Sequence, residues 1–351
     1  MAYTTIDDPT DYFETILYTG NGSSLEVNGL DFSPDWVWIK KRSNASNSMV
    51  YDTVRGIKKH LHTNTSDGEV SEASDDIGLN SFDSDGFTVK VNGNTNTNTH
   101  TYASWNWKAG TTGSGTTTGS GTGKAYSYSV NTTAGFSIVT YLGNGTEDHT
   151  IPHHLGVAPK MYMVKQRDDS DSWITYHDGL GGADKYILLD TTGAVGTSNN
   201  PWGTVAPTSS VNNLGSAGDT NGNGDSFIMY SFAEKKGYSK FGVYTGNQDT
   251  NFGPFIYTGF KPALLIVKNT AGNNWGMLDN KRDPSNGMET RLHPNLSNAD
   301  NTGAGVVIDF LSNGFKCRNN DGLENPSNEV IYMAFAENPF VTSTGVPTTA
   351  R

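Results

Sequence analysis

The sequence contains one cysteine, Cys317, among its 351 residues. A single thiol excludes an intramolecular disulfide framework and a multi-cysteine zinc site. No stretch approaches the roughly 18 consecutive apolar residues that a membrane-spanning helix needs. The first eight residues, MAYTTIDD, have neither a basic nor an apolar region, so we expect no signal peptide. These features predict a soluble protein that is made in a reducing cytoplasm and does not insert into membranes.

Charged and apolar residues are both scarce. Only 17% of residues are charged and 34% are apolar, a pairing that argues against a membrane protein and against a highly charged disordered chain. The net charge of −12 repels phosphate backbones, so we expect no nucleic-acid partner.

Turn-forming residues are abundant instead. Glycine occurs 41 times, Asn, Thr and Ser are conspicuous, and aromatic residues reach 11%. Helical patterns are weak throughout, whereas strand signals recur at short intervals. The composition therefore predicts an all-β protein, and the length predicts two or three domains.

Three segments of the chain resemble one another. Each has a Tyr-x-Gly-Asn motif, at 18–21, 141–144 and 244–247. An apolar run that begins with proline and ends with lysine follows at 34–40, 159–165 and 262–268. Apolar residues occupy both parities of each run, which predicts a strand covered on both faces. We expect the lysine to return the chain to water.

The segments also close alike. Residues 102–108, 229–235 and 332–338 align so that Trp105, Phe232 and Phe335 take equivalent places. This predicts three separate cores, each with an aromatic residue at its centre. Asp52, Asp178 and Asp279 correspond as well, and we interpret this repeated carboxylate as a turn or cap.

We therefore expect three tandem antiparallel β-sandwich modules of the jelly-roll kind. The predicted limits are an N-terminal arm at 1–12, module 1 at 13–109, a linker at 110–124, module 2 at 125–241, module 3 at 242–341 and a tail at 342–351. The linker is rich in Gly, Thr and Ser and should be flexible. Modules 2 and 3 should abut rigidly, and the arm should be extended and available for docking.

Longer motifs resemble a known family. They are the strand entry at 29–40, SFAEK at 231–235, GFKPA at 259–263 and DNKR at 279–282. Together they resemble a repeat domain found in virion proteins of marine tailed phages, including phages of cyanobacteria and of abundant ocean heterotrophs. The resemblance covers the chain from about Asp11 to its end. It implies concanavalin-like sandwiches in a tail-fibre or structural protein, and it carries over no catalytic residue.

One segment has the beginning of a calcium-loop pattern. Asp219, Asn221, Asn223 and Asp225 alternate as oxygen ligands, with glycine at the sixth place. The twelfth place, however, is Tyr230 instead of a bidentate carboxylate. The competing interpretation is an ordinary glycine-rich connector, and we expect no cofactor.

Trp173, Trp202 and Trp275 are candidate glycan-binding residues. They lie among Ser, Asn, Asp and Gly and outside the apolar runs, so exposure in loops is expected. Exposed aromatic rings flanked by amides and carboxylates suit the C–H faces and hydroxyls of sugars. The competing interpretation is that each ring covers its own core or an interface between modules.

These features predict a non-enzymatic virion surface protein, a tail fibre or head-surface appendage, that forms a homotrimer and contacts other virion proteins and host-surface glycans. The arm and module 1 would attach it, and modules 2 and 3 would face the host. Two alternatives stay open. One is a purely structural capsid-decorating or connector protein without a receptor role. The other is a polysaccharide depolymerase, which would need paired carboxylates roughly 5–10 Å apart in a groove.

Overall fold

The computed structural model of the protein describes residues 2–74, 76–303, 305 and 307–348. Within these ranges the chain forms six sheets whose strands pair antiparallel, as the all-β prediction requires. The helical elements are α1 (Gly218–Asn221) and two 3₁₀ turns, η1 (Pro9–Asp11) and η2 (Asp178–Leu180). None of the helices in the described part of the chain is long and apolar enough to cross a membrane.

Three large sheets share an order of four neighbouring strands. The first is β1 (Phe13–Thr19), β9 (Thr101–Trp107), β3 (Trp36–Lys41), β4 (Met49–Asp52), β5 (Lys59–His62) and β6 (Val70–Ser71). The second is β10 (Thr111–Thr116), β12 (Ala125–Asn131), β13 (Phe136–Leu142), β20 (Ser226–Phe232), β15 (Met161–Gln166), β16 (Ile174–His177), β17 (Lys185–Leu188) and β18 (Gly196–Thr197). The third is β21 (Ser239–Thr245), β27 (Glu329–Pro339), β23 (Phe260–Asn269) and β24 (Trp275–Asp279). The shared order is β1-β9-β3-β4 in the first, β13-β20-β15-β16 in the second and β21-β27-β23-β24 in the third.

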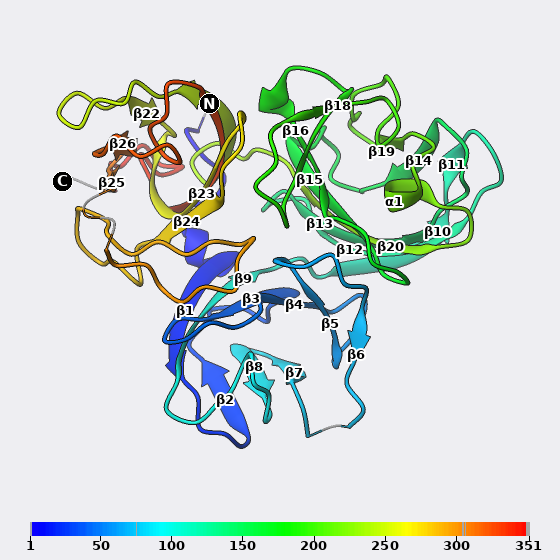
Figure 1. Cartoon of the computed structure of the whole chain (residues 1–351), viewed down its shortest axis with the longest axis horizontal. Coiled ribbons are helices and arrows are strands. Elements are labelled where there is room, and N and C mark those ends of the chain that lie inside the picture. Colours follow the sequence, from blue (N-terminus) through cyan, green and yellow to red (C-terminus); the bar gives the residue numbers. More distant parts are fainter. Residues whose placement is uncertain (1, 75, 304, 306, 349–351) are drawn as a thin grey trace.

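A three-stranded sheet accompanies each large one. These small sheets are β2 (Leu25–Asn28), β8 (Gly86–Val89) and β7 (Leu79–Asp83); β11 (Thr118–Gly119), β14 (His149–Pro152) and β19 (Val211–Leu214); and β22 (Phe255–Tyr257), β26 (Gly314–Cys317) and β25 (Ile308–Leu311). We call strands β1–β9 unit 1, β10–β20 unit 2 and β21–β27 unit 3. The large sheets meet in the middle of the molecule, and the small sheets lie toward its periphery (Figure 1).

The Tyr-x-Gly-Asn motif recurs because one local structure recurs. In unit 1 the Tyr18 hydroxyl donates to the Thr95 carbonyl at 2.7 Å, and the Asn21 N–H donates to the Asn96 side chain at 2.8 Å. The same bonds join Tyr141 to Thr220, Asn144 to Asn221, Tyr244 to Glu324 and Asn247 to Asn325. A Cβ on Gly20 would lie 2.3 Å from the Thr97 carbonyl oxygen, so the motif needs glycine there.

Each unit has an apolar core between its large and its small sheet. In unit 1, Val37 and Tyr51 of the large sheet pack with Val27 and Phe87 of the small one. Units 2 and 3 have corresponding clusters that contain Tyr162 with Leu214 and Leu265 with Phe315.

A fourth core joins the three units. Its members come from the opposite faces of all three large sheets and include Trp36, Trp107, Phe232, Leu264 and Phe335. Each unit therefore has a core of its own, but the aromatic residues predicted at the centres of three separate cores, Trp105, Phe232 and Phe335, all lie in the shared core instead. The shared core also explains the pattern of the proline-initiated strands. In β3, Trp36 and Trp38 face the shared core while Val37 and Ile39 face that of unit 1, so the prediction of two covered faces is confirmed.

The strand registers show that one predicted alignment of the three segments is wrong by two residues. β9 pairs with β3 so that Trp107 lies opposite Trp36, and the matching partners are Phe232 with Met161 and Phe335 with Leu264. Trp107, and not Trp105, is therefore equivalent to Phe232 and Phe335. The sequence motifs match either way because aromatic residues stand at both positions of β9.

The prediction of a flexible linker at 110–124 is also wrong. Residues 111–116 form β10, which pairs with β12 along its whole length, and residues 118–119 form β11, which pairs with β14. A Gly/Thr/Ser tract has no large side chain to bury, but its backbone can still complete a sheet edge. The predicted limit after 241 falls inside β21, so unit 3 begins earlier than expected.

The N-terminal arm packs on the molecule and is not a free extension. Ile6 is buried in the shared core, and the Tyr3 hydroxyl donates to the Gly259 carbonyl at 2.7 Å. The Asp7 carboxylate accepts hydrogen bonds from Ser343 of the predicted tail. Residues 2–12 thus connect unit 1 to unit 3. Residue 1 and residues 349–351 lie outside the described ranges.

Candidate functional site

The three candidate tryptophans are buried, with 0, 0 and 2% of Trp173, Trp202 and Trp275 exposed. The Trp173 indole N–H donates to the His62 carbonyl of unit 1, and that of Trp275 donates to the Leu188 carbonyl of unit 2. Trp202 packs in T-shaped contacts against Tyr162 and Tyr176, whose rings stack on each other in the core of unit 2. The expected loop exposure is wrong, and none of the three rings can stack on a sugar in this conformation.

The candidate calcium residues do not form a ligand loop. Residues 218–221 make helix α1, and both ends of the Asn221 amide are engaged. Its oxygen accepts from the Asn144 N–H, and its nitrogen donates to the Thr146 and Gly215 carbonyls at 2.9 and 2.7 Å. Asp219, Asn223 and Asp225 flank this structural amide. In the described part of the chain, no group of three or more His, Cys, Asp or Glu side chains could hold a metal ion.

A buried ion pair at the start of a turn joins units 1 and 2. Asp52 ends β4 and caps the turn by accepting from the Arg55 N–H, and its Oδ2 lies 2.5 Å from Arg55 Nε. Both side chains are fully buried. The Tyr230 hydroxyl of unit 2 donates to Asp52 at 2.7 Å, and an Arg55 nitrogen donates to the same hydroxyl at 3.2 Å. The predicted turn cap therefore also forms a junction between units.

The same motif joins units 3 and 1. Asp279 accepts from the Arg282 N–H and lies 2.6 Å from Arg282 Nε, again with both side chains fully buried. The Trp105 indole N–H of unit 1 donates to Asp279 at 3.1 Å, and the Arg282 guanidinium lies 5.6 Å from the Trp105 ring centre. Trp105 and Tyr230 occupy equivalent positions in β9 and β20, two residues before Trp107 and Phe232.

Unit 2 uses a neutral version of this motif. Met161 pairs with His177, whereas Trp36 pairs with Asp52, so His177 and not Asp178 is the equivalent residue. His177 caps its turn by accepting from the Gly179 N–H, and its Nε2 lies 3.1 Å from the Tyr332 carbonyl of unit 3. Through this turn each unit contacts a strand of another unit. Unit 1 contacts β20 of unit 2, unit 2 contacts β27 of unit 3, and unit 3 contacts β9 of unit 1. The three contacts close a ring.

The lysines that end the proline-initiated runs are buried at or near the junctions. Lys40, Lys165 and Lys268 are each no more than 1% exposed, so the expected return to water is wrong. Lys40 donates to the Leu296 carbonyl of unit 3 and Lys268 to the Thr191 carbonyl of unit 2. Burial lowers the pKa of Lys40 to about 7 and the pKa values of Lys165 and Lys268 to about 8.

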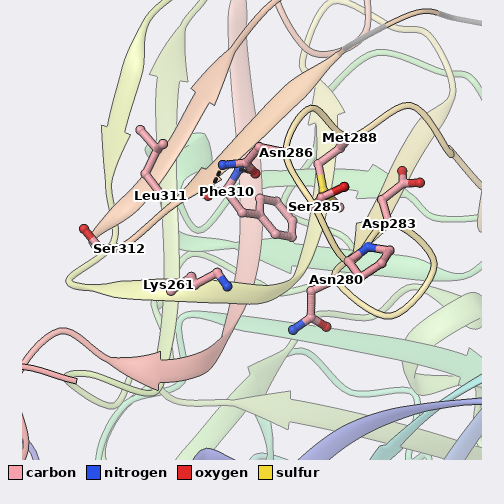
Figure 2. Close-up of a pocket in the computed structure, with 10 residues that line it drawn as sticks. Lys261, Asn280, Asp283, Ser285, Asn286, Met288, Phe310, Leu311 and Ser312 are labelled. Carbon is pink, nitrogen blue, oxygen red and sulfur yellow. Dashed lines mark hydrogen bonds between the residues drawn. The ribbon is translucent and has the colours of Figure 1, made fainter. Parts of the chain in front are cut away.

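Unit 3 contains an open hollow of about 240 Å³ (Figure 2). Met288 and Phe310, both buried, supply apolar surface. The other lining residues are Lys261, Asn280, Asp283, Pro284, Ser285, Asn286, Leu311 and Ser312. A second hollow of about 230 Å³ shares Lys261, Asn280 and Pro284 with it and extends to Glu14 of unit 1.

Hydrogen bonds hold the loop that lines this hollow. The Asn286 amide donates to the Phe310 carbonyl at 2.8 Å and accepts from the Phe310 N–H at 2.9 Å, as Figure 2 shows. The Asp283 carboxylate accepts from the Glu289 and Thr290 N–H groups and from the Thr290 hydroxyl. Both Asp283 oxygens are thus occupied within the loop, which leaves this carboxylate poorly placed for acid–base chemistry.

One buried polar atom of a residue that lines the hollow, the Asn280 side-chain oxygen, has no hydrogen-bond partner among the described residues. Glu337 Oε2 lies 2.7 Å from Lys261 Nζ and accepts from the Asn280 amide nitrogen at 2.9 Å. The Asn280 oxygen is then left buried without a hydrogen-bond partner among the described residues. An unpaired buried acceptor of this kind is costly for the fold.

The exposed aromatic residues of the molecule lie in unit 3 as well. Phe252, Phe255 and Tyr257 are 78, 47 and 51% exposed. The sequence does not reveal their exposure, because Phe255-Ile256-Tyr257 reads as an apolar strand. The signal that could have found them is the glycine- and proline-rich segment at 253–254, which marks a short strand at a sheet edge.

Cys317 is a packed thiol. It is buried in the core of unit 3, and burial raises its pKa to about 12, so it is a poor nucleophile.

Comparison with known proteins gives one family. A model described as "Domain of unknown function (DUF7483)" matches residues 8–339, which span all three units. No curated protein and no solved structure matches the chain.

Proposed function

The chain belongs to the DUF7483 family, and from this premise we propose that it is a non-enzymatic surface protein of a tailed bacteriophage particle, built from three β-sandwich modules. It serves as a tail fibre or a head-surface appendage and contacts host-surface glycans. The motifs at 29–40 and 259–263 support this location through their resemblance to virion proteins of marine tailed phages.

The closed ring of three units is the observation that carries the proposal. The buried ion pairs at Asp52 and Asp279 serve the junctions between units, and the shared core gives the ring rigidity without disulfides. A particle surface needs a fold that resists unfolding and presents polar loops. The hollow in unit 3 offers binding groups, which favours a contact role over pure capsid decoration.

The expected orientation of the chain on the particle loses both of its reasons. Attachment through the arm and module 1 depended on a flexible linker and a free arm. Because residues 111–116 form a strand and Tyr3 packs on unit 3, neither reason holds, and we do not propose that polarity.

Purified particles of the encoding phage test the location. We expect mass spectrometry to detect the chain in the particles and cryo-electron microscopy to resolve a three-lobed ring on their surface. Absence of the chain from purified particles would refute the proposal. We further propose a homotrimer, for which light scattering should give three times 37.8 kDa, whereas the mass of one chain would exclude it.

A further inference from the structure

The outer edge of unit 3 presents two aromatic rings on one face. β22 is an edge strand of its sheet, and its burial alternates so that Ile256 points inward while Phe255 and Tyr257 point outward. Phe252 precedes this strand in a turn that the Asp249 carboxylate holds by accepting from the Asn251 and Phe252 N–H groups, both at 2.8 Å. The strand β22 that carries the two rings lies at the periphery of the molecule (Figure 1), and neither ring belongs to the shared core.

The fold does not require aromatic residues at these places. Tyr257 lies opposite Gly314 in β26, as Asn28 lies opposite Gly86 in β8. A Cβ on Gly86 would lie 1.9 Å from the Val27 carbonyl oxygen, and one on Gly314 would lie 2.1 Å from that of Ile256, so the local geometry is the same.

The equivalents of Phe255 and Tyr257 in unit 1 are therefore Glu26 and Asn28, which are also exposed. In unit 2 the corresponding strand β14 is covered by β11. Among the described residues, unit 3 is thus the one unit whose strand at this position combines an uncovered edge with exposed aromatic side chains.

Charged and hydroxyl groups surround the two rings. Lys316 lies directly opposite Phe255 in the sheet, and Asp309 lies opposite Lys316, so the three side chains share the outer face. The Tyr257 hydroxyl is 3.1 Å from that of Tyr3, whose ring has Lys236 Nζ 4.4 Å from its centre. Leu311, in the same outward row as Tyr257, also lines the hollow of Figure 2.

The mixture of aromatic, charged and hydroxyl groups on this face indicates the kind of partner. Cores of protein interfaces are depleted of charged residues, whereas this face interleaves rings with lysine and aspartate. A pyranose presents C–H groups on its faces and hydroxyls on its edges, so it stacks on a ring while neighbouring polar groups bond its hydroxyls. We infer that Phe255 and Tyr257 form a stacking site for pyranose residues of a surface polysaccharide. This inference rests on the glycan-contacting role proposed above and assigns it to unit 3.

The test replaces the two rings with the residues that unit 1 carries. The double variant Phe255→Glu/Tyr257→Asn should fold, because the same scaffold accepts Glu26 and Asn28. Wild-type protein is first screened on an array of bacterial surface polysaccharides, and a bound polysaccharide is then titrated. We expect the Kd of the double variant to rise at least tenfold, while the matched control Glu26→Gln/Asn28→Ser in unit 1 binds like wild type.

Three outcomes would overturn the inference: wild-type protein binds nothing on the array, the double variant binds as tightly as wild type, or it changes the oligomeric mass, since the face would then join copies of this chain. A thermal unfolding curve like that of wild type shows that the variant is folded. If the double variant is misfolded, the single variant Tyr257→Asn replaces it, and its Kd for the polysaccharide should also rise. Particle localisation is a separate measurement, so the chain can be present on particles while this site fails, or absent while this site binds.

Discussion

The Tyr230 hydroxyl of unit 2 donates a hydrogen bond of 2.7 Å to the Asp52 carboxylate of unit 1, across 178 positions of sequence. Both residues are fully buried, and Arg55 completes the group with bonds to each of them. A buried charge pair is costly to leave incomplete, because its desolvation is offset only when its bonds are made. The contact therefore fixes how the two units are placed.

Tyr230→Phe should destabilise the protein by about 1–3 kcal/mol, because it removes one buried hydrogen bond and leaves its partners unsatisfied. Urea unfolding measures the change. Tyr128→Phe is the control, since the Tyr128 hydroxyl has no hydrogen-bond partner among the described residues and its loss should change the free energy of unfolding little. Equal effects of the two variants would contradict the assigned junction.

Arg282→Leu should cost roughly 3–5 kcal/mol, because Asp279 is left as an unpaired buried charge. Unit 2 suggests the rescue, since His177 and Leu180 stand where unit 3 has Asp279 and Arg282. The double variant Asp279→His/Arg282→Leu should therefore be more stable than Arg282→Leu alone. A double variant that is less stable than the single one would show that the two turns are not equivalent.

Acidification should destabilise the fold through its buried histidines. Burial lowers the pKa of His177 to about 4, below its ordinary value near 6.5. As pH falls from 7 to 5 the unfolded chain takes up a proton at this site while the folded chain does not, so stability falls, by about 2 kcal/mol for one such histidine. His177→Gln should show a smaller loss of Tm between pH 7 and pH 5 than wild type. An unchanged loss would indicate that His177 titrates normally.

Hydrogen exchange should distinguish a strand from a flexible linker at 111–116. Amides of β10 that bond to β12 should exchange at least roughly tenfold more slowly than those of an unstructured peptide. Complete exchange throughout 110–124 within seconds would restore the linker interpretation.

The composition of the sequence predicted the all-β class, and its repeated motifs predicted the strands covered on both faces. They could not predict the shared core, because a strand with two buried faces reads the same whether the second cover is its own unit or a neighbour. The expectation that Lys40, Lys165 and Lys268 reach water was wrong for a related reason. A lysine after an apolar run ordinarily reaches water, but here backbone carbonyls accept from each ammonium group, across a junction for Lys40 and Lys268 and within unit 2 for Lys165.

The candidate site was harder to find from the sequence. Trp173 and Trp275 stand among polar residues because they end short loops, yet they reach into other units. Phe255 and Tyr257 stand in an apolar strand, yet they face solvent. Sequence neighbours report the local strand, and only the sheet order shows which strand lies at an edge.

The shared core also bears on how the chain folds during synthesis. Until Phe335 has left the ribosome, the inner faces of the first two large sheets lack their third cover. Trp36, Trp107 and Phe232 are then exposed, and exposed apolar surface makes an incomplete chain prone to aggregation. Once β27 has paired with β21 and β23, the ring of three units is complete. The three units should then unfold together in one thermal transition, whereas independent domains would unfold separately.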